Sequence, residues 1–318
     1  MKKKKIIWAL LDERDGNRNQ VLSILSHLNS NYKIINIKYN FLARLPNIFF
    51  QLYNNTIHVK NFKIPTDQSC PDMVISCGRR TATIALQIKK FFSFKPFCVH
   101  LMYPSFTLLK SNFNLIFVPD HDHVKQNFYI RKFLGAPSNI KLIKKKKKYS
   151  EPIIFLIIGG DHGRFKLSVI EIENIINQVL KKFNNNGSLL ISTSRRTSKE
   201  IIKKLDYLAT IHSIISHVYH PKLSNNENKN PYLEYLSIAN EIIVTGDSIS
   251  MISDACQTKK PVRIYYNKRF CSNKHIRFCN KLIDLGYAFS FETIGLKCKV
   301  LKKLDTSEKI AMYINKVF

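Results

Sequence analysis

The segment with the clearest chemical capacity covers residues 241–266 and reads EIIVTGDSISMISDACQTKKPVRIYY. An apolar run typical of a buried strand ends before Gly246, and Asp247 or Ser248 can cap a helix that begins directly after it. The free backbone amides of such a helix start, with Ser248 and Ser250 beside them, attract phosphate because the helix dipole is positive there. This pattern predicts a phosphate-binding site at the end of the strand, with Gly246, Asp247, Ser248 and Ser250 as its residues.

An acidic residue on the same predicted helix extends this site. Asp254 lies six residues beyond Ser248, and its carboxylate could accept hydrogen bonds from a ribose diol once a pyrophosphate occupies the helix start. The alternative is an ordinary strand–helix–strand crossover with a good N-cap. The cluster GDS-x-S followed by an acid favours the nucleotide interpretation.

A glycine-rich turn, IGGDHGRF, follows another predicted strand at residues 158–165. Gly159 and Gly160 allow close backbone approach to a ligand, and Arg164 can neutralise phosphate. The spacing matches neither the P-loop nor the dinucleotide-binding fingerprint. The alternative is a tight turn without a ligand.

Two similar clusters of small polar residues and arginines follow strands in the two halves of the chain. One is ISTSRRT at residues 191–197, and the other is ISCGRRT at residues 75–81. Guanidinium groups at such positions suit phosphate, and the repetition predicts a shared polyanionic ligand. The alternative is a solvated helix start in each half. The residues expected to bind phosphate or acceptor are Ser194, Arg195, Arg196, Arg79 and Arg80.

The polar turn DERDGNRNQ at residues 12–20 follows the first predicted strand. Asp12 and Asn17 could recognise an acceptor, and Asp12, Glu13 or Asp15 could act as a general base, Asp15 being the favoured candidate. His100, at the end of a later strand, is the second candidate base. An internally paired Asp-Gly turn and a core histidine are the respective alternatives.

A metal site is not predicted. The segment His121-Asp122-His123 would need a further ligand and a geometry that adjacent residues rarely supply. The sequence predicts no other cofactor.

The charge of the chain favours phosphate-bearing partners. Its 318 residues include 51 lysines and arginines against 22 acids, a formal net charge of +29, and such a field attracts nucleic acid, anionic lipid and nucleotides. Biased genome composition is the alternative for most lysines, although the runs Lys2–Lys5 and Lys144–Lys148 stand out. No nucleic-acid-binding motif accompanies the charge, so nucleic acid is not an expected partner.

The cysteine pattern and the hydrophobic runs indicate the compartment. The seven cysteines form no C-x-x-C pair, which favours a reducing environment. The first apolar run, Ile6–Leu11, has only the length of a strand, and no run approaches the ~20 residues of a membrane-spanning helix. We expect a cytoplasmic protein that could attach to the inner membrane peripherally.

Short apolar runs alternate with helical periodicity, which is typical of parallel α/β sheets. We expect two doubly wound Rossmann-like domains facing each other across a cleft. The predicted organisation is an acceptor-side domain (1–143), a lysine-rich linker (144–152), a nucleotide-sugar domain (153–290) and a C-terminal tail or helix (291–318). The predicted strands are 6–11, 32–39, 73–76, 98–102, 115–118, 153–158, 188–192, 217–219, 241–244 and 261–266. The predicted helices are 20–28, 169–183, 199–208, 231–239, 248–256 and 275–285, with one more after Gly78 whose apolar positions are Ile84, Leu86, Ile88 and Phe91.

Several motifs together resemble a bacterial and plant family named for a plant mitochondrial-fission protein, the "elongated mitochondria" protein. They are LLDERDGNRNQ, ISCGRRTA, VHLMYPS, VPDHD, LISTSRRT, NPY and IVTGDSISMISDACQTKKPV, spread from Trp8 to Gly286. The resemblance implies a GT-B-like fold, sugar transfer in bacteria and a membrane-division role in plants. The GDS-x-S segment also resembles the donor-binding helix of GT-B transferases, where an acid holds the donor ribose. Asp254 stands where many relatives carry glutamate, so its side chain reaches less far.

The function expected from these features is transfer of a sugar from a nucleotide-diphosphate sugar to a cell-envelope lipid or saccharide. Two alternatives stay open: a membrane-surface adaptor without catalytic activity, and a nucleotide-sugar epimerase or hydrolase.

Overall fold

The computed structural model describes residues 5–45, 57–60, 62–65, 69–104, 112–122, 124–143, 148–184, 186–221, 223, 230–297 and 302–318. The chain divides into two compact units, one of residues 1–139 with 305–318 and one of residues 140–304. The C-terminal segment Asp305–Phe318 therefore belongs to the first unit and is not a separate tail. The run Lys144–Lys147 of the predicted linker lies outside the described residues.

The described part of the first unit contains a six-stranded parallel sheet with the order β2-β1-β3-β4-β5-β6. Its strands are β1 (Ile6–Leu11), β2 (Asn31–Asn36), β3 (Met73–Cys77), β4 (Phe97–Leu101), β5 (Leu115–Pro119) and β6 (Ile130–Phe133). The helices are α1 (Asp15–Leu25), α3 (Arg79–Phe91) and α10 (Thr306–Val317), with a 3₁₀ turn η1 (Phe41–Arg44).

The strand β1 shows how this sheet is covered on both faces. Alternate side chains of a strand point to opposite faces. Ile7 and Leu11 join the core formed with α1 and α10, whereas Trp8 and Leu10 join the core formed with α3. This is the doubly wound arrangement that the near-continuous apolar strands predict.

The second unit repeats this architecture over its described residues, with a six-stranded sheet in the order β12-β11-β10-β7-β8-β9. Its strands are β7 (Ile153–Ile157), β8 (Ser188–Ser192), β9 (Ile215–Tyr219), β10 (Glu241–Thr245), β11 (Val262–Tyr265) and β12 (Phe289–Ser290). Its helices are α5 (Val169–Phe183), α6 (Lys199–Ile211), α7 (Tyr232–Ile238), α8 (Ile249–Gln257) and α9 (Asn273–Asp284), with a 3₁₀ turn η3 (Phe291–Thr293).

Both faces of the second sheet are buried as well. Ile154 and Leu156 of β7 pack in the core with α5 and α6. Phe155, between them, meets the rings of Tyr232 and Tyr235 of α7 edge-on, with centroids 5.7 and 5.4 Å away. The two predicted Rossmann-like units are therefore present.

Serine caps fix the starts of three helices in this unit. The hydroxyls of Ser168, Ser198 and Ser272 accept hydrogen bonds from backbone amides in the first turns of α5, α6 and α9 at 3.3–3.4 Å. Each cap satisfies one donor that a helix start leaves without an intrahelical partner.

The structure differs from the sequence-based prediction in a few elements. Helix α1 starts at Asp15, not Gln20, because the polar turn supplies its first turn: the amides of Asn17 and Arg18 both donate to the carbonyl of Arg14. Strands β6 and β12 were not predicted because four and two residues give no measurable periodicity. None of the described helices has the length and apolar character needed to cross a membrane.

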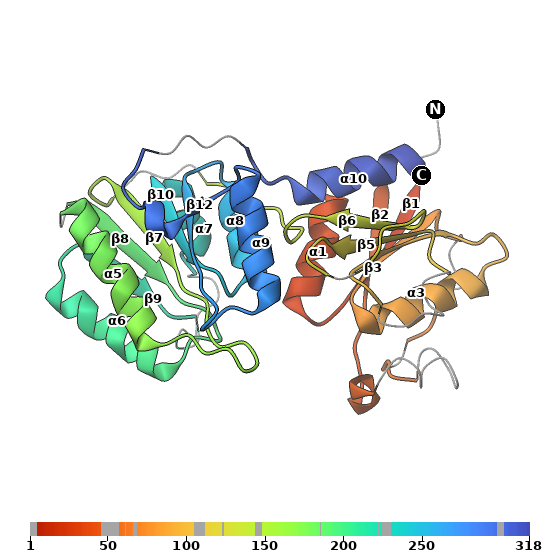
Figure 1. Cartoon of the computed structure of the whole chain (residues 1–318). Helices are drawn as coiled ribbons and strands as arrows, with labels where there is room; N and C mark the ends of the chain where they lie inside the picture. The colour runs from red at the N-terminus through yellow and green to blue at the C-terminus, as the bar shows by residue number, and fades with distance from the viewer. Residues whose placement is uncertain are drawn as a thin grey trace. The chain divides into compact units, whose positions relative to one another are not determined.

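Helix α10 completes the first unit from the far end of the sequence. Figure 1 shows it in blue near the red α1, and the two helices are in contact. Thr306 donates to the carbonyl of Leu134 at 2.6 Å, and the Ser307 hydroxyl lies within hydrogen-bond distance, 2.9 Å, of both the Ser23 hydroxyl and the Ser138 carbonyl.

We predict that Ile314→Ala lowers the free energy of unfolding of the first unit by about 2–5 kcal/mol, because this fully buried side chain would leave a cavity. Met312 on the same helix is 64% exposed, so Met312→Ala should change it by less than about 0.5 kcal/mol. Urea unfolding followed by fluorescence of Trp8, the single tryptophan, measures both. Equal effects would show that α10 does not belong to the first core.

Candidate functional site

Four loops of the second unit lie at one edge of its sheet. Strands β7, β8, β10 and β11 are parallel neighbours, so the loops that follow them meet at the carboxyl edge. This is the edge where ligands bind in open α/β sheets. The predicted donor residues all follow β7, β8 or β10.

The carboxylate of Asp247 connects three of these loops. Its side chain is fully buried and accepts hydrogen bonds from the Gly160 amide at 2.8 Å and the Thr245 hydroxyl at 2.7 Å. Arg196 donates to it through Nη2 at 3.2 Å. Burial raises the pKa of Asp247, and these donors oppose the rise. The prediction that Asp247 faces the ligand or caps α8 with its side chain is therefore wrong, since the carboxylate is used inside the protein.

Gly159 and Gly160 are glycines because the protein itself occupies the space beside them. A Cβ on Gly159 would lie 2.0 Å from Oδ2 of Asp247. A Cβ on Gly160 would lie 2.3 Å from the backbone carbonyl of Arg196. The close approach that we expected toward a ligand is thus an approach between loops of the same unit.

The turn after β8 is held against these glycines. Thr197 donates its hydroxyl to the carbonyl of Gly159 and accepts from the Ser194 amide at 2.9 Å. The guanidinium of Arg196 also donates to the carbonyl of Asp161 at 3.1 Å. Both Arg195 and Arg196 are exposed, and the hydrogen bonds of Arg196 to Asp161 and Asp247 help to fix the site.

The start of α8 keeps the features of a phosphate site. Ser248 is its N-cap, and its hydroxyl makes no capping hydrogen bond. Ser250 is exposed, and Asp254 is partly exposed. These two residues are separated by four positions and so lie on the same face of the helix. The Tyr232 hydroxyl donates to Oδ2 of Asp254 at 3.5 Å.

Gly246 has a packing role at this position. A Cβ there would lie 2.4 Å from the Cβ of Tyr266, so the glycine lets the ends of β10 and β11 come together. The sequence predicts Gly246 beside the donor phosphate; the structure explains the need for glycine at this position by the close approach of Tyr266.

The loop after β7 contains the predicted phosphate ligand Arg164 together with Asp161 and His162, which the sequence analysis did not select. Asp161 pairs with Lys166 at 2.9 Å and closes the loop, while exposed Arg164 lies over the ring of Phe165. The exposed His162 meets the buried ring of His275 edge-on, with centroids 5.1 Å apart. Burial, followed by the charges of His162, Lys274 and Arg196, lowers the pKa of His275 to about 4. The sequence does indicate His275 indirectly, because it lies in the first turn of α9, whose N-cap is Ser272 and whose start lies at the carboxyl edge of the second sheet.

In the first unit, Asp12 and Asn17 bind each other. Asp12 is buried; its Oδ2 accepts from the Asn17 amide group at 2.6 Å and its Oδ1 from the Arg14 backbone amide at 3.2 Å. Gly78, at φ +84°, leaves room for this amide, which would lie 2.4 Å from a Cβ. These two candidate acceptor contacts are thus occupied internally, whereas Asp15 is exposed in the first turn of α1.

Arg79 and Arg80 also make internal contacts. Arg79 donates to the carbonyls of Leu45 and Ala43, at 2.5 and 3.2 Å, and burial lowers its pKa. Arg80 lies over the ring of Tyr39, with 5.2 Å between the guanidinium carbon and the centroid. Both side chains hold the segment after β2 against α3. The prediction that the two arginine clusters share one polyanionic ligand stays a prediction.

His100 is not placed to act as a base on a bound acceptor. It is fully buried in β4, hydrogen-bonded through Nδ1 to the Ser76 hydroxyl at 2.8 Å and stacked on Phe113. Burial lowers its pKa to about 3, so the ring is neutral at physiological pH. The prediction of His100 as a catalytic base is therefore wrong, and the core-histidine alternative holds.

Two further observations concern other sites. Among the described residues, no group of three or more His, Cys, Asp or Glu side chains could hold a metal ion; His123 lies outside them.

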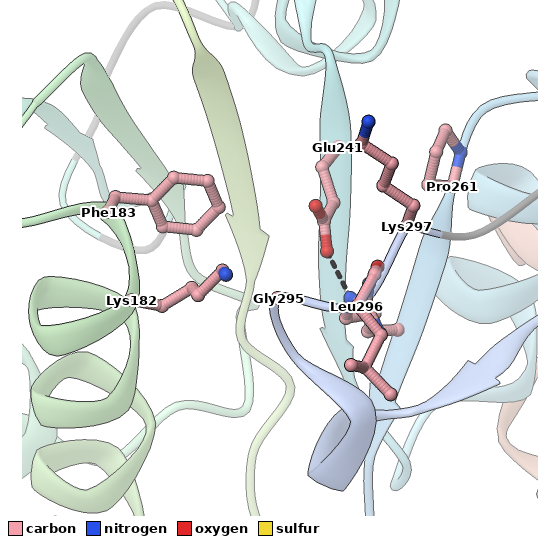
Figure 2. A pocket seen from close by; sticks show the side chains of 8 residues that line it. Lys182, Phe183, Glu241, Pro261, Gly295, Leu296 and Lys297 are labelled. Atoms are coloured by element: carbon pink, nitrogen blue, oxygen red, sulfur yellow. Dashed lines mark hydrogen bonds and ion pairs between the residues drawn. The ribbon is translucent and has the colours of Figure 1, made fainter.

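A hollow of about 450 Å³ lies beside the starts of β10 and β11, at the opposite edge of the sheet from the donor residues. Figure 2 shows Glu241, Pro261 and Lys297 on one side of it and Lys182 and Phe183 of α5 on the other.

We predict that Gly159→Ala destabilises the second unit by about 1–3 kcal/mol, because its Cβ would clash with the fixed Asp247 carboxylate. Gly16→Ala is the matched control, since a Cβ there meets nothing within 4 Å. Scanning calorimetry of the two variants distinguishes these cases. A Gly159→Ala protein as stable as wild type would mean that Asp247 moves freely.

Acid should destabilise the first unit through His100. In the unfolded chain His100 has a pKa near 6.5, whereas in the folded protein its pKa is about 3. Between these two values the unfolded state binds a proton that the folded state does not bind, so the free energy of unfolding falls as the pH drops from 6.5 toward 3. From pH 7 to 5 the loss from this residue is about 2 kcal/mol. His100→Asn, which keeps a hydrogen-bond acceptor for Ser76, should flatten the pH dependence of urea unfolding, and exposed His27→Asn should not. An unchanged slope in His100→Asn would contradict this.

Comparison with known proteins places this chain in a family. A model of the family "Mitochondrial fission ELM1" matches residues 15–318. The uncharacterized protein RP120 of Rickettsia prowazekii (strain Madrid E) is 32% identical, with 97% of each chain covered. The mitochondrial fission protein ELM1 of Arabidopsis thaliana is 24% identical over 70% of this chain and 57% of its own length.

The fold is similar to that of solved nucleotide-sugar enzymes. UDP-GlcNAc 2-epimerase of Methanocaldococcus jannaschii superposes with a TM-score of 0.54 at 13% identity, over 98% of this chain and 99% of the other. S. aureus MnaA, solved with UDP, gives 0.54 at 12% identity, over 98% and 96%. The glycotransferase of kitacinnamycin gives 0.54 at 10% identity, over 99% of both chains. The fold is that of GT-B glycosyltransferases and UDP-GlcNAc 2-epimerases, and the chain belongs to the mitochondrial fission ELM1 family.

Proposed function

We propose that this protein is a glycosyltransferase that takes a sugar from a nucleotide-diphosphate sugar and gives it to a cell-envelope lipid or saccharide. The observation that carries the proposal is helix α8, whose N-cap Ser248 makes no side-chain capping hydrogen bond and whose first turn exposes Ser250. The carboxylate of Asp254 lies one turn further along, on the same face of the helix as Ser250. The similarity in fold to a UDP-bound protein supports a nucleotide as the ligand.

In the proposed complex the diphosphate lies against the first turn of α8. The backbone amides there carry the positive end of the helix dipole, and the exposed Arg195 adds a positive charge. Arg196 contributes differently: its bond to Asp247 fixes the loops that shape the site. Fixed dipoles of this kind stabilise the negative charge that develops on a departing diphosphate.

Asp254 is the proposed partner of the donor ribose. One of its oxygens accepts from Tyr232 at 3.5 Å, and an ionised carboxylate has further lone pairs for a diol. Burial, followed by the charge of Asp254 and this hydrogen bond, raises the pKa of Tyr232 well above its ordinary value, so the phenol keeps the proton that holds Asp254 in place.

The acceptor side is proposed for the carboxyl edge of the first sheet. With His100 buried and Asp12 tied to Asn17, Asp15 is the candidate base that remains, because its side chain is exposed at the start of α1. The proposed place of action is the cytoplasmic face of the inner membrane, where the basic surface attracts anionic lipid at about 1 kcal/mol per near-surface lysine or arginine.

Two other functions are favoured by specific findings. The fold similarity to UDP-GlcNAc 2-epimerases supports epimerisation or hydrolysis of a nucleotide sugar, in which product forms without an acceptor. The family's fission protein in Arabidopsis supports a non-catalytic adaptor, which needs no nucleotide.

We predict that one nucleoside diphosphate raises the melting temperature of the protein in a panel covering the common bases. A ligand present at 100 times its Kd stabilises the folded state by about 2.7 kcal/mol. Asp254→Asn should lose most of that shift, because a neutral amide accepts fewer hydrogen bonds from a diol, and Ser250→Ala should lose part of it. Asp284→Asn, an exposed carboxylate at the far end of α9, is the control and should keep the full shift.

Incubation with the corresponding nucleotide sugar then separates the functions. Product formed only with an envelope acceptor supports the transferase, and product without an acceptor supports the epimerase or hydrolase. A folded protein whose melting temperature responds to no nucleotide would contradict both and leave the adaptor.

A further inference from the structure

The end of α3 and the turn that connects it to β4 expose two phenylalanine rings. Phe91 is 53% exposed and Phe94 is 87% exposed. Lys90, Ser93 and Lys95 around them are exposed as well. A large aromatic side chain gains free energy when it leaves water, so two such rings on one short turn indicate a surface that is covered in the working protein.

The turn is anchored and holds these rings outward. Phe92, between the exposed residues, meets the buried ring of Trp8 edge-on at 5.7 Å. The Cys70 thiol donates to the carbonyl of Phe94 at 2.9 Å. Lys89 donates to the Asn112 carbonyl and to Oδ1 of Asn114, both at 2.8 Å. Because these contacts come from three separate segments, Phe91 and Phe94 cannot easily fold back into the core.

The charge around the turn is mainly positive, although the exposed Asp72 lies at the same amino edge, where its carbonyl accepts from the Phe97 amide and its carboxylate accepts from the Ile6 amide. Between Asp72 and Asp120 the sequence contains no aspartate or glutamate. The turn precedes β4 and therefore lies at the amino edge of the first sheet. Lys5 directly precedes the parallel strand β1 at the same edge, and Lys2–Lys4 come immediately before it in the sequence.

We propose that this turn docks the protein on an anionic lipid bilayer. Phe91 and Phe94 insert at the boundary between headgroups and acyl chains, and Lys90 and Lys95 bind the lipid phosphates. Aromatic rings next to lysines are the side chains that bind at this boundary. The inference rests on the peripheral attachment in the proposed function and names the surface that makes it.

The shape of the turn favours a bilayer over a protein partner. A stable protein–protein interface covers about 800 Å² on each partner, and two rings on a convex turn supply only a small part of that. A bilayer needs only a few inserted side chains together with electrostatic attraction.

The experiment is co-sedimentation of the full chain with phosphatidylcholine vesicles, with and without phosphatidylglycerol, at moderate salt. The wild type should bind the anionic vesicles much more strongly than the neutral ones. Phe91→Ser/Phe94→Ser should weaken that binding at least about tenfold, and Lys90→Gln/Lys95→Gln should reduce its salt dependence. Phe41→Ser is the matched control: Phe41 is 80% exposed but follows β2 at the opposite edge of the sheet, so binding should not change.

A second measurement reports insertion directly. In a Phe94→Trp protein the new indole should shift its emission to the blue on anionic vesicles and be quenched by brominated lipid, while Phe41→Trp should show neither effect. This readout does not depend on any loss of folding. The nucleotide-induced melting shift is measured on Phe91→Ser/Phe94→Ser as well, and its persistence separates a failure of docking from a failure of donor binding.

Two results would overturn the proposal. One is vesicle binding by Phe91→Ser/Phe94→Ser at the wild-type level. The other is a wild type that binds no vesicle and elutes as an oligomer that the same double substitution dissociates, which would assign the turn to a contact between copies of this chain.

Discussion

The site in the second unit depends on one buried carboxylate. Asp247 receives hydrogen bonds from the Gly160 amide, the Thr245 hydroxyl and the Arg196 guanidinium, and so joins the loops after β7, β8 and β10. A buried charge is tolerated only when it is paired and hydrogen-bonded in this way. The start of α8, which follows Asp247 directly, is therefore held in a fixed position at the edge of the sheet. A preorganised helix start is what phosphate binding requires.

The first unit uses the same physical solution with different residues. Asp12, at the end of β1, is buried and binds Asn17, and Gly78 at the end of β3 leaves room for that amide. In both units an aspartate and a glycine at strand ends let loops pack closely without a clash. Side chains that could meet a substrate therefore stand next to these pairs: Ser250 and Asp254 in one unit, and Asp15 in the other.

Most of the fold could be predicted from the sequence, because buried parallel strands and capped helices leave local patterns. Helix α5 and strand β8 have the predicted bounds. The short strands β6 and β12 had no such pattern. The family and the GT-B fold were predicted from motifs. The roles of individual residues within the site were harder to predict from the sequence. No local pattern shows that Asp247 pairs with Arg196, or that Arg79 and Arg80 hold the segment after β2. The burial of His100 is indicated by the sequence, because its neighbours in β4 are apolar.

The central claim is that a nucleotide binds at the start of α8 in the second unit. Hydrogen–deuterium exchange of the backbone amides, measured with and without saturating nucleoside diphosphate, tests it most directly. A bound nucleotide should slow exchange in the first turn of α8, next to Ser248 and Ser250, and leave exchange in the first turn of α3, next to Arg79, unchanged. Protection at α3 with none at α8, or no protection in either helix, would contradict it.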